Sequence, residues 1–501
     1  MSIIFYHIFL WFYRLGIQLV APWNPKARRW LEGRKQIFSN IRATVEAGQV
    51  AAGAVGAGEA GGAREAGAGA GIAAKGPVIW MHCASLGEFE QGRPVLEAIR
   101  VMSPGCRIWV TFFSPSGYEV RKNYEGADHI FYLPLDSRSH ARQFIGLVKP
   151  TLVLWVKYDY WYYYLVELKK RNIPTLLISG VFRPDQPFFK WYGRLHRYML
   201  ECFTHLFVQT DTSKKLIGKL GISDNVSISG DTRFDRVIEI AQGAAPLPAV
   251  GLFCGDHTVI VAGSTWEEDE EELDHYANTH PEIRFIIAPH DIDEERLKDV
   301  ESLFRYTVRY SVWEREAGGP GAGQEAAGGK GPQATGIGGQ AGAKDAVAGG
   351  ERLQGAGAKE GGGMKKKGGH QRAGHDAAPN VLIIDNIGML SRLYQYATIA
   401  YVGGGFGDDG VHNVLEAAVY GKPVIFGPVI EKYIEAVELT ECGGGIVVDS
   451  ALEVESVFNR LLNDPEEYRQ TGEASRDYVH SKKGATGKIT DYIQENRLLT
   501  S

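Results

Sequence analysis

The chain has 501 residues and carries 54 Lys and Arg against 60 Asp and Glu, a formal net charge of −6 at pH 7. This balance excludes nucleic-acid binding by the overall charge of the chain, so a polyanionic partner would have to meet a local basic patch. The five cysteines are widely spaced and form no C-x-x-C pair. They exclude a disulfide framework and a cysteine zinc site, and they favour a reducing compartment.

The first 22 residues are apolar but interrupted. His7, Arg14 and Gln18 recur at helical spacing and form one narrow polar stripe. A charge in the middle of the apolar run is not typical of a cleaved signal peptide. Three readings stay open: a helix that spans the membrane, a helix that lies in the headgroup plane, and a buried first helix of the globular domain. The basic residues at 26–35 favour a membrane-associated helix over residues 1–24 that lies in the interface, followed by a chain on the cytoplasmic side.

Two stretches, residues 47–75 and 315–378, are rich in Gly and Ala and poor in large apolar side chains. Such segments bury too little apolar surface to offset the entropy of ordering, so we expect disorder. Extra length in a surface loop costs little free energy, and both stretches are therefore interpreted as insertions. The rest of the chain is long enough for two domains of about 200 residues.

Short apolar runs alternate with helical patterns along both halves of the chain, which is typical of a parallel sheet covered on both faces. The expected α/β architecture has a lobe over residues 25–240 and a second lobe over residues 252–490, joined near residues 236–257. The expected strands are 78–83, 108–112, 129–133, 152–156, 175–179, 205–208, 259–262, 284–288, 306–310, 381–384, 399–402 and 423–426.

The segment VIWMHCASLGEFE at residues 78–90 joins the first expected strand to a helix. Ser85 and Glu88 fit a capping box, in which Glu88 would only accept a backbone N–H. Two features favour a chemical role instead. The turn lies at the carboxyl end of a strand, where open α/β sheets bind ligands, and Gly87 allows a backbone or ligand to approach the acid.

Residues 82–88, HCASLGE, resemble the H-x-x-S-[hydrophobic]-G-E segment of the bacterial 3-deoxy-D-manno-octulosonic acid (Kdo) transferases. Further similar segments follow in the same order and cover most of the chain outside its low-complexity stretches. They are TFFSPSGYE at 111–119, YLPLD at 132–136, GDTRFDRV at 230–237, AGST at 262–265, APHD at 288–291 and GGGFGDDGVHNVLEAAVYGKPVIFGP at 403–428.

The resemblance implies the GT-B fold, two Rossmann-like lobes that face each other across a cleft. It also implies an inverting glycosyltransferase, a lipid IVA Kdo transferase of lipopolysaccharide biosynthesis that moves Kdo from CMP-Kdo to the lipid A precursor. The protein would work at the cytoplasmic face of the cell inner membrane, with no cofactor because CMP-Kdo is a substrate, with no metal, and with no nucleic-acid partner. The alternative is another nucleotide-sugar enzyme of the same fold, a UDP-sugar epimerase or a different membrane glycosyltransferase. A non-catalytic lipid-binding protein is a third class.

In the first lobe the resemblance assigns the catalytic base to Glu88. Because the amino end of a helix lowers the basicity of a carboxylate, we expect Glu88 to become an effective base only when bound acceptor removes water. The aromatic stretch 155–165 resembles an E-x-E-x-W-P-N element and makes Asp159 the matching acid, although Lys157 and Tyr162 depart from that pattern. Arg233 occupies a position usually filled by Lys and would hold the donor phosphate or carboxylate. An exposed surface arginine is the plain alternative.

In the second lobe a glycine run at residues 403–407 follows a strand and precedes a helix. Glycines there would leave backbone N–H groups free for an anion, although plain tight turns look the same. Asn413 and Glu416 fall three residues apart on one expected helix face. The acidic run at 267–272 is interpreted as a solvated first helical turn. The resemblance assigns the cytidine nucleotide to Pro289, His290, Ile387, Gly388, Met389, Asn413, Val414, Leu415 and Glu416.

Overall fold

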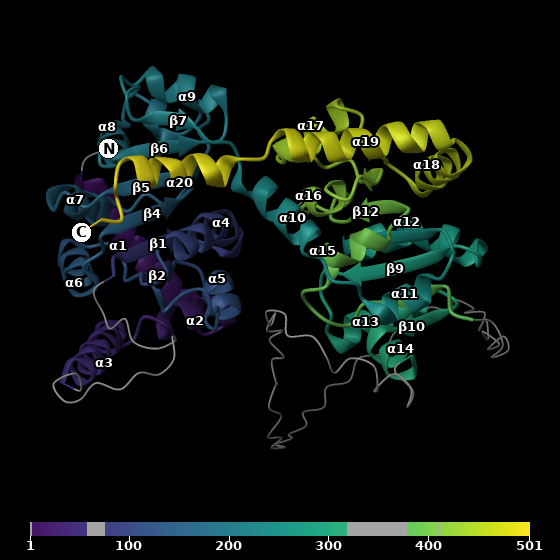
Figure 1. Cartoon of the computed structure of the whole chain (residues 1–501), viewed down its shortest axis with the longest axis horizontal. Coiled ribbons are helices and arrows are strands. Elements are labelled where there is room, and N and C mark those ends of the chain that lie inside the picture. Colours follow the sequence, from purple (N-terminus) through teal and green to yellow (C-terminus); the bar gives the residue numbers. More distant parts are fainter. Residues whose placement is uncertain (1–2, 58–75, 318–377, 409, 501) are drawn as a thin grey trace, which may run out of the picture.

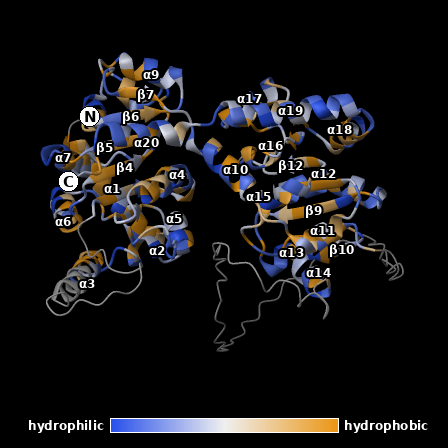
Figure 2. Ribbon diagram, in the orientation of Figure 1, coloured by the Kyte–Doolittle hydropathy of each residue, from blue (hydrophilic) through white to orange (hydrophobic). Residues whose placement is uncertain are grey.

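The structure is a computed structural model that describes residues 3–57, 76–317, 378–408 and 410–500. It consists of two lobes, each built on a seven-stranded parallel sheet with helices on both faces (Figure 1). Apolar residues gather along the strands, and the outer faces of helices such as α18 and α19 are more hydrophilic (Figure 2). The expected two-lobed α/β fold is therefore confirmed.

The first sheet has the strand order β3-β2-β1-β4-β5-β6-β7. Successive residues of β1 alternate between the cores on its two faces, with Trp80 on one side and Met81 on the other. Strands β1 and β4 are neighbours, and the chain leaves them in opposite directions, so this sheet has its topological switch point between them. The strands are β1 Val78–Cys83, β2 Arg107–Phe112, β3 His129–Tyr132, β4 Leu152–Val156, β5 Thr175–Gly180, β6 His205–Val208 and β7 Val226–Ile228.

The second sheet repeats this plan with the order β10-β11-β9-β8-β12-β13-β14, and its switch point lies between β8 and β12. The strands are β8 Val259–Thr265, β9 Arg284–Pro289, β10 Thr307–Arg309, β11 Val381–Ile383, β12 Ile399–Val402, β13 Val424–Phe426 and β14 Gly445–Val447.

The helices of the first lobe are α1 Ile3–Val20, α2 Pro25–Glu32, α3 Ile37–Ala57, α4 Leu86–Met102, α5 Pro115–Arg121, α6 Arg138–Val148, α7 Tyr162–Lys170, η1 Pro187–Phe189, α8 Arg194–Leu200 and α9 Asp211–Gly218. Helix α10, Thr232–Gln242, connects the lobes. The remaining helices are α11 Pro248–Cys254, α12 Glu267–Thr279, α13 Glu294–Leu303, α14 Tyr310–Ala317, α15 Leu390–Leu393, η2 Tyr394–Tyr396, α16 Leu415–Ala418, α17 Ile434–Glu441, α18 Ala451–Asn463, α19 Pro465–Ser481 and α20 Ala485–Glu495.

Two sequence expectations differ from the structure. Strands β7 and β14 have three residues each and were not predicted, because so short a run carries almost no periodicity. The expected disorder is wrong at residues 315–317, which belong to α14, and at residues 47–57, which belong to α3. Their alanines extend a helix that has already begun, and extension costs far less than nucleation. Residues 58–75 and 318–377 lie outside the described residues, so the rest of that expectation is not addressed.

The chain crosses between the lobes twice, once through α10 and once between α19 and α20 (Figure 1). Much of the expected connection at residues 236–257 is helical, in α10 and α11. The expected end of the second lobe at residue 490 falls inside α20. That helix packs on α4, and its Ile489 and Ile493 belong to a core of the first lobe. The last helix therefore packs on the first lobe and is part of it, although the chain reaches it from the second lobe.

Helix α1 lies on the first lobe with most of its apolar surface exposed. Only Tyr6 and Leu10 are buried, so the helix is not a buried element of the domain. The Tyr6 hydroxyl donates to Asp136 Oδ2 at 2.6 Å, and Asp136 also accepts the amide N–H groups of Tyr163 and Tyr164 at the start of α7. The outward residues are Ile4, Phe5, Ile8, Phe9, Trp11, Phe12, Leu19 and Val20.

The polar stripe of α1 is exposed but lies beside the buried residues of the helix and contacts the protein. The His7 ring stacks on Tyr163 with centroids 5.6 Å apart, and Arg14 and Gln18 line a cavity against the segment 30–39. By length and composition α1 is the one helix in the described part of the chain that could cross a membrane. The exposed surface of α1 is therefore mostly apolar.

Candidate active site

Two turns meet at the switch point of the first sheet. Residues 84–88 follow β1, and residues 157–159 follow β4. The parallel register sets His82 opposite Trp155, so both turns leave the same edge of the sheet. This is the place where open α/β sheets bind ligands. The structure thus brings Glu88 and Asp159 together, although they are 71 positions apart in the chain.

Glu88 lies in the first turn of α4 and is 8% exposed. Its Oε2 accepts the backbone N–H of Ala84. Ser85 precedes the helix, but its hydroxyl makes no capping hydrogen bond. The predicted capping box is therefore only half formed, because the acid reaches back while the serine does not complete the pair. The Ser85 hydroxyl is therefore not used to cap α4 and can bond another group at the turn.

Burial raises the pKa of Glu88 to about 7. The neighbouring Asp159 carboxylate raises it further, while the Ala84 N–H, the Lys157 ammonium and the Ser85 N–H lower it. The expectation that the helix end keeps Glu88 a weak base until the acceptor binds is wrong, because removal of water outweighs the backbone hydrogen bonds in the protein by itself. A carboxylate with a pKa near neutrality suits a general base.

Asp159 is the second acid of the site. Burial raises its pKa to about 6. Its Oδ2 is buried without a hydrogen-bond partner in the described part of the chain. Unsatisfied buried carboxylate oxygens are costly and are concentrated at functional sites. Asp159 can therefore accept a hydrogen bond from a ligand, and its charge keeps Glu88 basic.

Lys157 is a residue of this site to which the sequence reasoning gave no role. It follows β4 directly and adopts a left-handed backbone conformation with φ of 52°. Its ammonium makes no hydrogen bond or ion pair with any described residue, and it lies 5.3 Å from the centre of the Tyr158 ring. Burial and Arg233 lower its pKa, while Asp231, Glu435 and Glu88 oppose that effect. The sequence signal for this residue was a lysine directly after a buried strand, where ligands bind. It was noted only as a departure from the E-x-E pattern.

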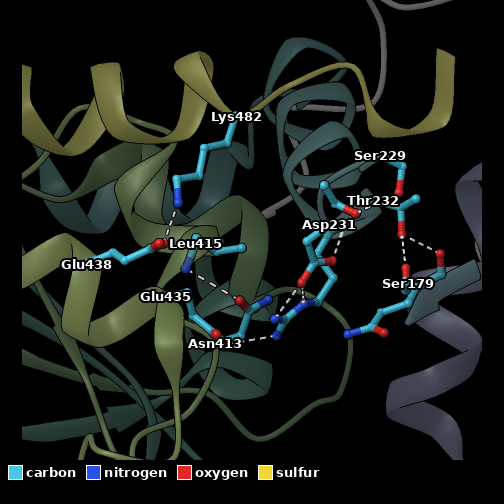
Figure 3. A network of polar contacts seen from close by, with 12 residues as sticks. Ser179, Ser229, Asp231, Thr232, Asn413, Leu415, Glu435, Glu438 and Lys482 are labelled. Carbon is cyan, nitrogen blue, oxygen red and sulfur yellow. Dashed lines mark hydrogen bonds and ion pairs between the residues drawn. The ribbon is translucent and has the colours of Figure 1, made fainter. Parts of the chain in front are cut away.

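Arg233 is neither an exposed arginine nor a free anion-binding group. Its Nη2 and Nε donate to Asp231 Oδ2 at 2.7 and 2.9 Å, and its Nη1 donates to Glu435 Oε1 at 2.8 Å. Asp231 precedes α10 and Glu435 lies in α17 of the second lobe (Figure 3). The two carboxylates raise the pKa of the guanidinium. Arg233 therefore forms an ion pair between the lobes.

The glycine run of the second lobe follows β12. Gly404 has φ of 90°, and its N–H donates to Asp269 Oδ2 at 2.8 Å, while the Gly403 N–H bonds Gly263 O at 2.9 Å. A Cβ on Gly405 would lie 2.5 Å from the Gly427 backbone. These N–H groups and this close approach therefore serve the fold, in contrast to the expected free anion-binding amides.

The interpretation of the acidic run 267–272 as a solvated helical turn is wrong for two of its members. Asp269 and Glu270 are fully buried. Asp269 accepts from Gly404 N, Trp266 N and the Tyr401 hydroxyl, and Glu270 accepts from Thr265 and pairs with Arg296. Asp269 holds the turn after β8 against the turn after β12 at the second switch point, and Glu270 joins the end of β8 to Arg296 of α13.

The predicted nucleotide residues all lie where strands of the second sheet end. Pro289 ends β9, and the His290 ring stacks between Trp266 at 4.6 Å and His412 at 4.7 Å. Ile387 and Gly388 follow β11 and precede Met389 at the start of α15, and the Ile387 side chain is exposed.

The last four predicted nucleotide residues surround the start of α16. Asn413 Nδ2 donates to Glu416 Oε1 at 2.9 Å, so these side chains bond each other. Val414 and Leu415 are buried. Burial raises the pKa of Glu416, and Glu90 of α4 raises it further. This part of the second lobe therefore faces the amino end of α4, where Glu88 lies.

No group of three or more His, Cys, Asp or Glu side chains within the described residues could hold a metal ion. The five cysteines are free, and only Cys442 is exposed.

Comparisons with known proteins agree with this geometry. The sequence model of the 3-deoxy-D-manno-octulosonic-acid transferase (kdotransferase) family matches residues 60–236. A 3-deoxy-D-manno-octulosonic acid transferase of Chlamydophila psittaci is 25% identical over 427 residues, which cover 83% of this chain and 84% of that protein. A bifunctional glycosyltransferase/methyltransferase of Fusobacterium nucleatum is 24% identical over 432 residues, which cover 84% of this chain. The match spans only 55% of that longer protein.

A solved structure has a similar fold. The UDP-GlcNAc 2-epimerase of Neisseria meningitidis, determined with bound UDP-GlcNAc, superposes with a TM-score of 0.53 at 16% identity and covers 84% of this chain and 100% of that chain. The two lobes, each on a seven-stranded parallel sheet, have the GT-B-like fold. The comparisons support a glycosyltransferase and the 3-deoxy-D-manno-octulosonic acid transferase family for this chain.

Replacing Glu88 by Gln separates a capping role from a catalytic one. Gln can accept the Ala84 N–H, but it cannot take a proton. We expect turnover to fall about 10²–10⁴-fold. At pH 8 the melting temperature should stay equal or rise, because the variant no longer buries a charge whose pKa is raised. Glu441→Gln, at an exposed position, is the matched control and should change neither quantity. Near-normal turnover of Glu88→Gln would remove this residue from the mechanism.

The pH profile tests the electrostatics of the pair. A base with a pKa of about 7 acts only when deprotonated, so kcat/KM should rise with pH and reach half its plateau near pH 7. Asp159→Asn removes a negative neighbour and should move this limb to lower pH. Lys157→Met removes a positive neighbour and should move it to higher pH. Shifts of the same sign in both variants would contradict the assignment of the limb to Glu88.

Proposed function

We propose that this glycosyltransferase moves Kdo from CMP-Kdo to the lipid A precursor, lipid IVA, with inversion at the anomeric carbon. The observation that carries the proposal is the buried Glu88 carboxyl at the switch point of the first lobe, whose pKa is raised to about 7. Its helix α4 lies opposite the predicted nucleotide residues of the second lobe. The sequence relatives named as Kdo transferases support the donor sugar.

In this reaction the hydroxyl oxygen of the acceptor sugar attacks the anomeric carbon of Kdo. The bond from that carbon to the phosphate oxygen breaks, and its electron pair leaves with CMP. Glu88 takes the proton of the attacking hydroxyl. Asp159 accepts a hydrogen bond from the bound sugar through its unpartnered Oδ2 and keeps Glu88 basic.

The donor brings a carboxylate and a phosphate into the site. Lys157 is the group that meets this charge, because its ammonium is unpaired in the described chain and lies among the charges of both lobes. Arg233 stays in the proposal in another role. Its bonds to Asp231 and Glu435 fix the distance between the lobes, and it reaches an anion only if Glu435 releases it. The predicted nucleotide residues of the second lobe would hold the cytidine.

The acceptor is a lipid, and α1 offers the corresponding surface. Eight large apolar side chains of α1 are exposed, and the basic segment 26–35 follows them. We infer that α1 lies in the cytoplasmic leaflet of the inner membrane with its apolar side in the bilayer. A UDP-sugar epimerase with the same fold would have no use for this surface.

The direct test is incubation of the purified protein with CMP-Kdo and lipid IVA, followed by mass spectrometry of the lipid and detection of released CMP. We expect a lipid product heavier by Kdo units, absent from the Glu88→Gln reaction. Incubation with UDP-GlcNAc in parallel tests the epimerase. Conversion of UDP-GlcNAc to its 2-epimer, with no change in the lipid, would replace this proposal by the alternative.

The membrane contact is tested without touching the fold. A variant with Phe5→Ser, Phe12→Ser and Leu19→Ser changes three exposed side chains of α1. Its sedimentation with vesicles of phosphatidylethanolamine and phosphatidylglycerol should weaken about tenfold or more, because each apolar side chain contributes on the order of 1 kcal/mol or more when buried. Val101→Ser, Val120→Ser and Leu452→Ser change exposed apolar residues elsewhere and should leave binding intact. Equal loss in both triple variants would contradict the role of α1.

A further inference from the structure

A cavity of about 530 Å³ lies between α1, the segment 30–39 and the loop after β3. Its polar lining is positive: Arg14, Arg34 and Lys35 contribute cations, and His140 and Gln18 contribute further polar groups. No Asp or Glu lines it. We call it the Arg34 cavity. A lining with several cations and no acid attracts anions.

Arg34 lacks a counter-ion. Its Nε, Nη1 and Nη2 donate to the backbone carbonyls of Leu133, Trp30 and Phe113 at 3.0, 3.1 and 2.8 Å. Its guanidinium lies 3.9 Å from the centre of the Trp30 ring and makes no ion pair with a described carboxylate. Burial lowers its pKa to about 9. A buried cation without a charge partner is costly, and a guanidinium has five N–H donors, so two are left for another acceptor.

A second unsatisfied donor lies in the same wall. Trp30 is 5% exposed, and its indole Nε1–H has no hydrogen-bond acceptor within the described residues. Buried donors are almost always satisfied in folded proteins. Arg34 and Trp30 both line the cavity, so its wall holds a guanidinium without a carboxylate partner and an indole N–H without an acceptor among the described residues, donor types that bind phosphate oxygens.

The position of the cavity limits the kind of ligand. Arg14 and Gln18 come from α1 and lie one helical turn apart, while Trp11 and Leu19 of the same helix are exposed. Helix α1 therefore contributes a cation to the cavity and apolar side chains to the outer surface. A ligand that satisfies both carries a phosphate on an apolar body.

The cavity is connected to the turn of Glu88 through Arg34 and the segment 113–114. Arg34 holds the carbonyl of Phe113, and the next N–H, of Ser114, donates to Ala84 O at 2.7 Å. The Phe113 ring packs on Trp161 with centroids 4.6 Å apart. Arg34 and Phe113 therefore connect the cavity to the turns of Glu88 and Asp159.

We propose that the Arg34 cavity binds the phosphate group of a membrane lipid, which supplies the missing counter-ion of Arg34. The phosphate belongs either to the acceptor sugar or to a phospholipid headgroup. For the acceptor, this inference rests on the proposed function. For binding itself it does not, because binding is measured without donor or transfer.

The binding test uses full-length protein and a soluble short-chain lipid, dihexanoylphosphatidic acid, with melting temperature as the readout. The lipid should raise the melting temperature of the wild type, since a ligand of the folded state stabilises it. Dihexanoylphosphatidylcholine and inorganic phosphate at the same concentration should raise it less. Because Arg34 is part of the fold, the variant is Arg14→Gln with Lys35→Gln, both exposed, and its apparent affinity should fall about tenfold or more.

The matched control is Lys26→Gln with Arg29→Gln, which removes the same charge from the same basic segment but not from the cavity. Its response should equal that of the wild type. Equal losses in both double variants would show general attraction by the basic segment and overturn the proposal. An absent wild-type response would overturn it too, and an equal response to inorganic phosphate would overturn the assignment to a lipid.

The transfer assay then identifies the lipid. If the acceptor phosphate occupies the cavity, dephosphorylated acceptor should show a raised KM with the wild type and little further change with Arg14→Gln/Lys35→Gln. A KM that rises by the same factor in both proteins assigns the cavity to a phospholipid headgroup. Failure of transfer with an intact melting response would count against the proposed function and leave the cavity assignment standing.

Discussion

The structure depends on the burial of one carboxyl group at the edge of a parallel sheet. Glu88 stays in place because α4 lies close against β1 and β4, and that approach needs Gly92, where a Cβ would lie 2.5 Å from Met81 Sδ and 2.9 Å from Val156 Cγ2. The Ala84 N–H fixes the acid at the start of the helix, and the loss of water raises its pKa. Packing by a small residue therefore helps to keep water from the Glu88 carboxyl and so to raise its pKa.

The second dependence is a series of charges between the lobes. From the first lobe to the second it passes through Glu88, Lys157, Asp231, Arg233 and Glu435, with alternating signs. Each cation interacts with acids on both sides, so a change in the lobe spacing that breaks the Arg233 to Glu435 contact also changes the field at Lys157. The position of the second lobe is thus coupled to the Lys157 ammonium, and through it to Glu88.

The sequence predicted the two-lobed fold and most strands, because fully buried strands of a parallel sheet are continuous apolar runs. It also placed Glu88 and Asp159 at strand ends, and the structure brings them together. It did not predict what depends on distant partners. Nothing near Asp269 in the chain indicates that Gly404 will donate to it, and nothing near Arg233 indicates Glu435. Asp269 was interpreted as solvated because its donors Tyr401 and Gly404 lie 132 and 135 positions away in the chain.

Most of the apolar surface of the first helix is exposed. Tyr6 and Leu10 pack on the first lobe, and the polar residues His7 and Arg14 lie beside them, with His7 against Tyr163 and Arg14 at the Arg34 cavity. Exposed apolar surface is unfavourable in water, so this helix suits an apolar outer medium. Tyr6 fixes the rotation of the helix through its bond to the buried Asp136, which also accepts the first N–H groups of α7 behind Asp159. The same carboxylate therefore orients both α1 and the helix that follows the turn after β4.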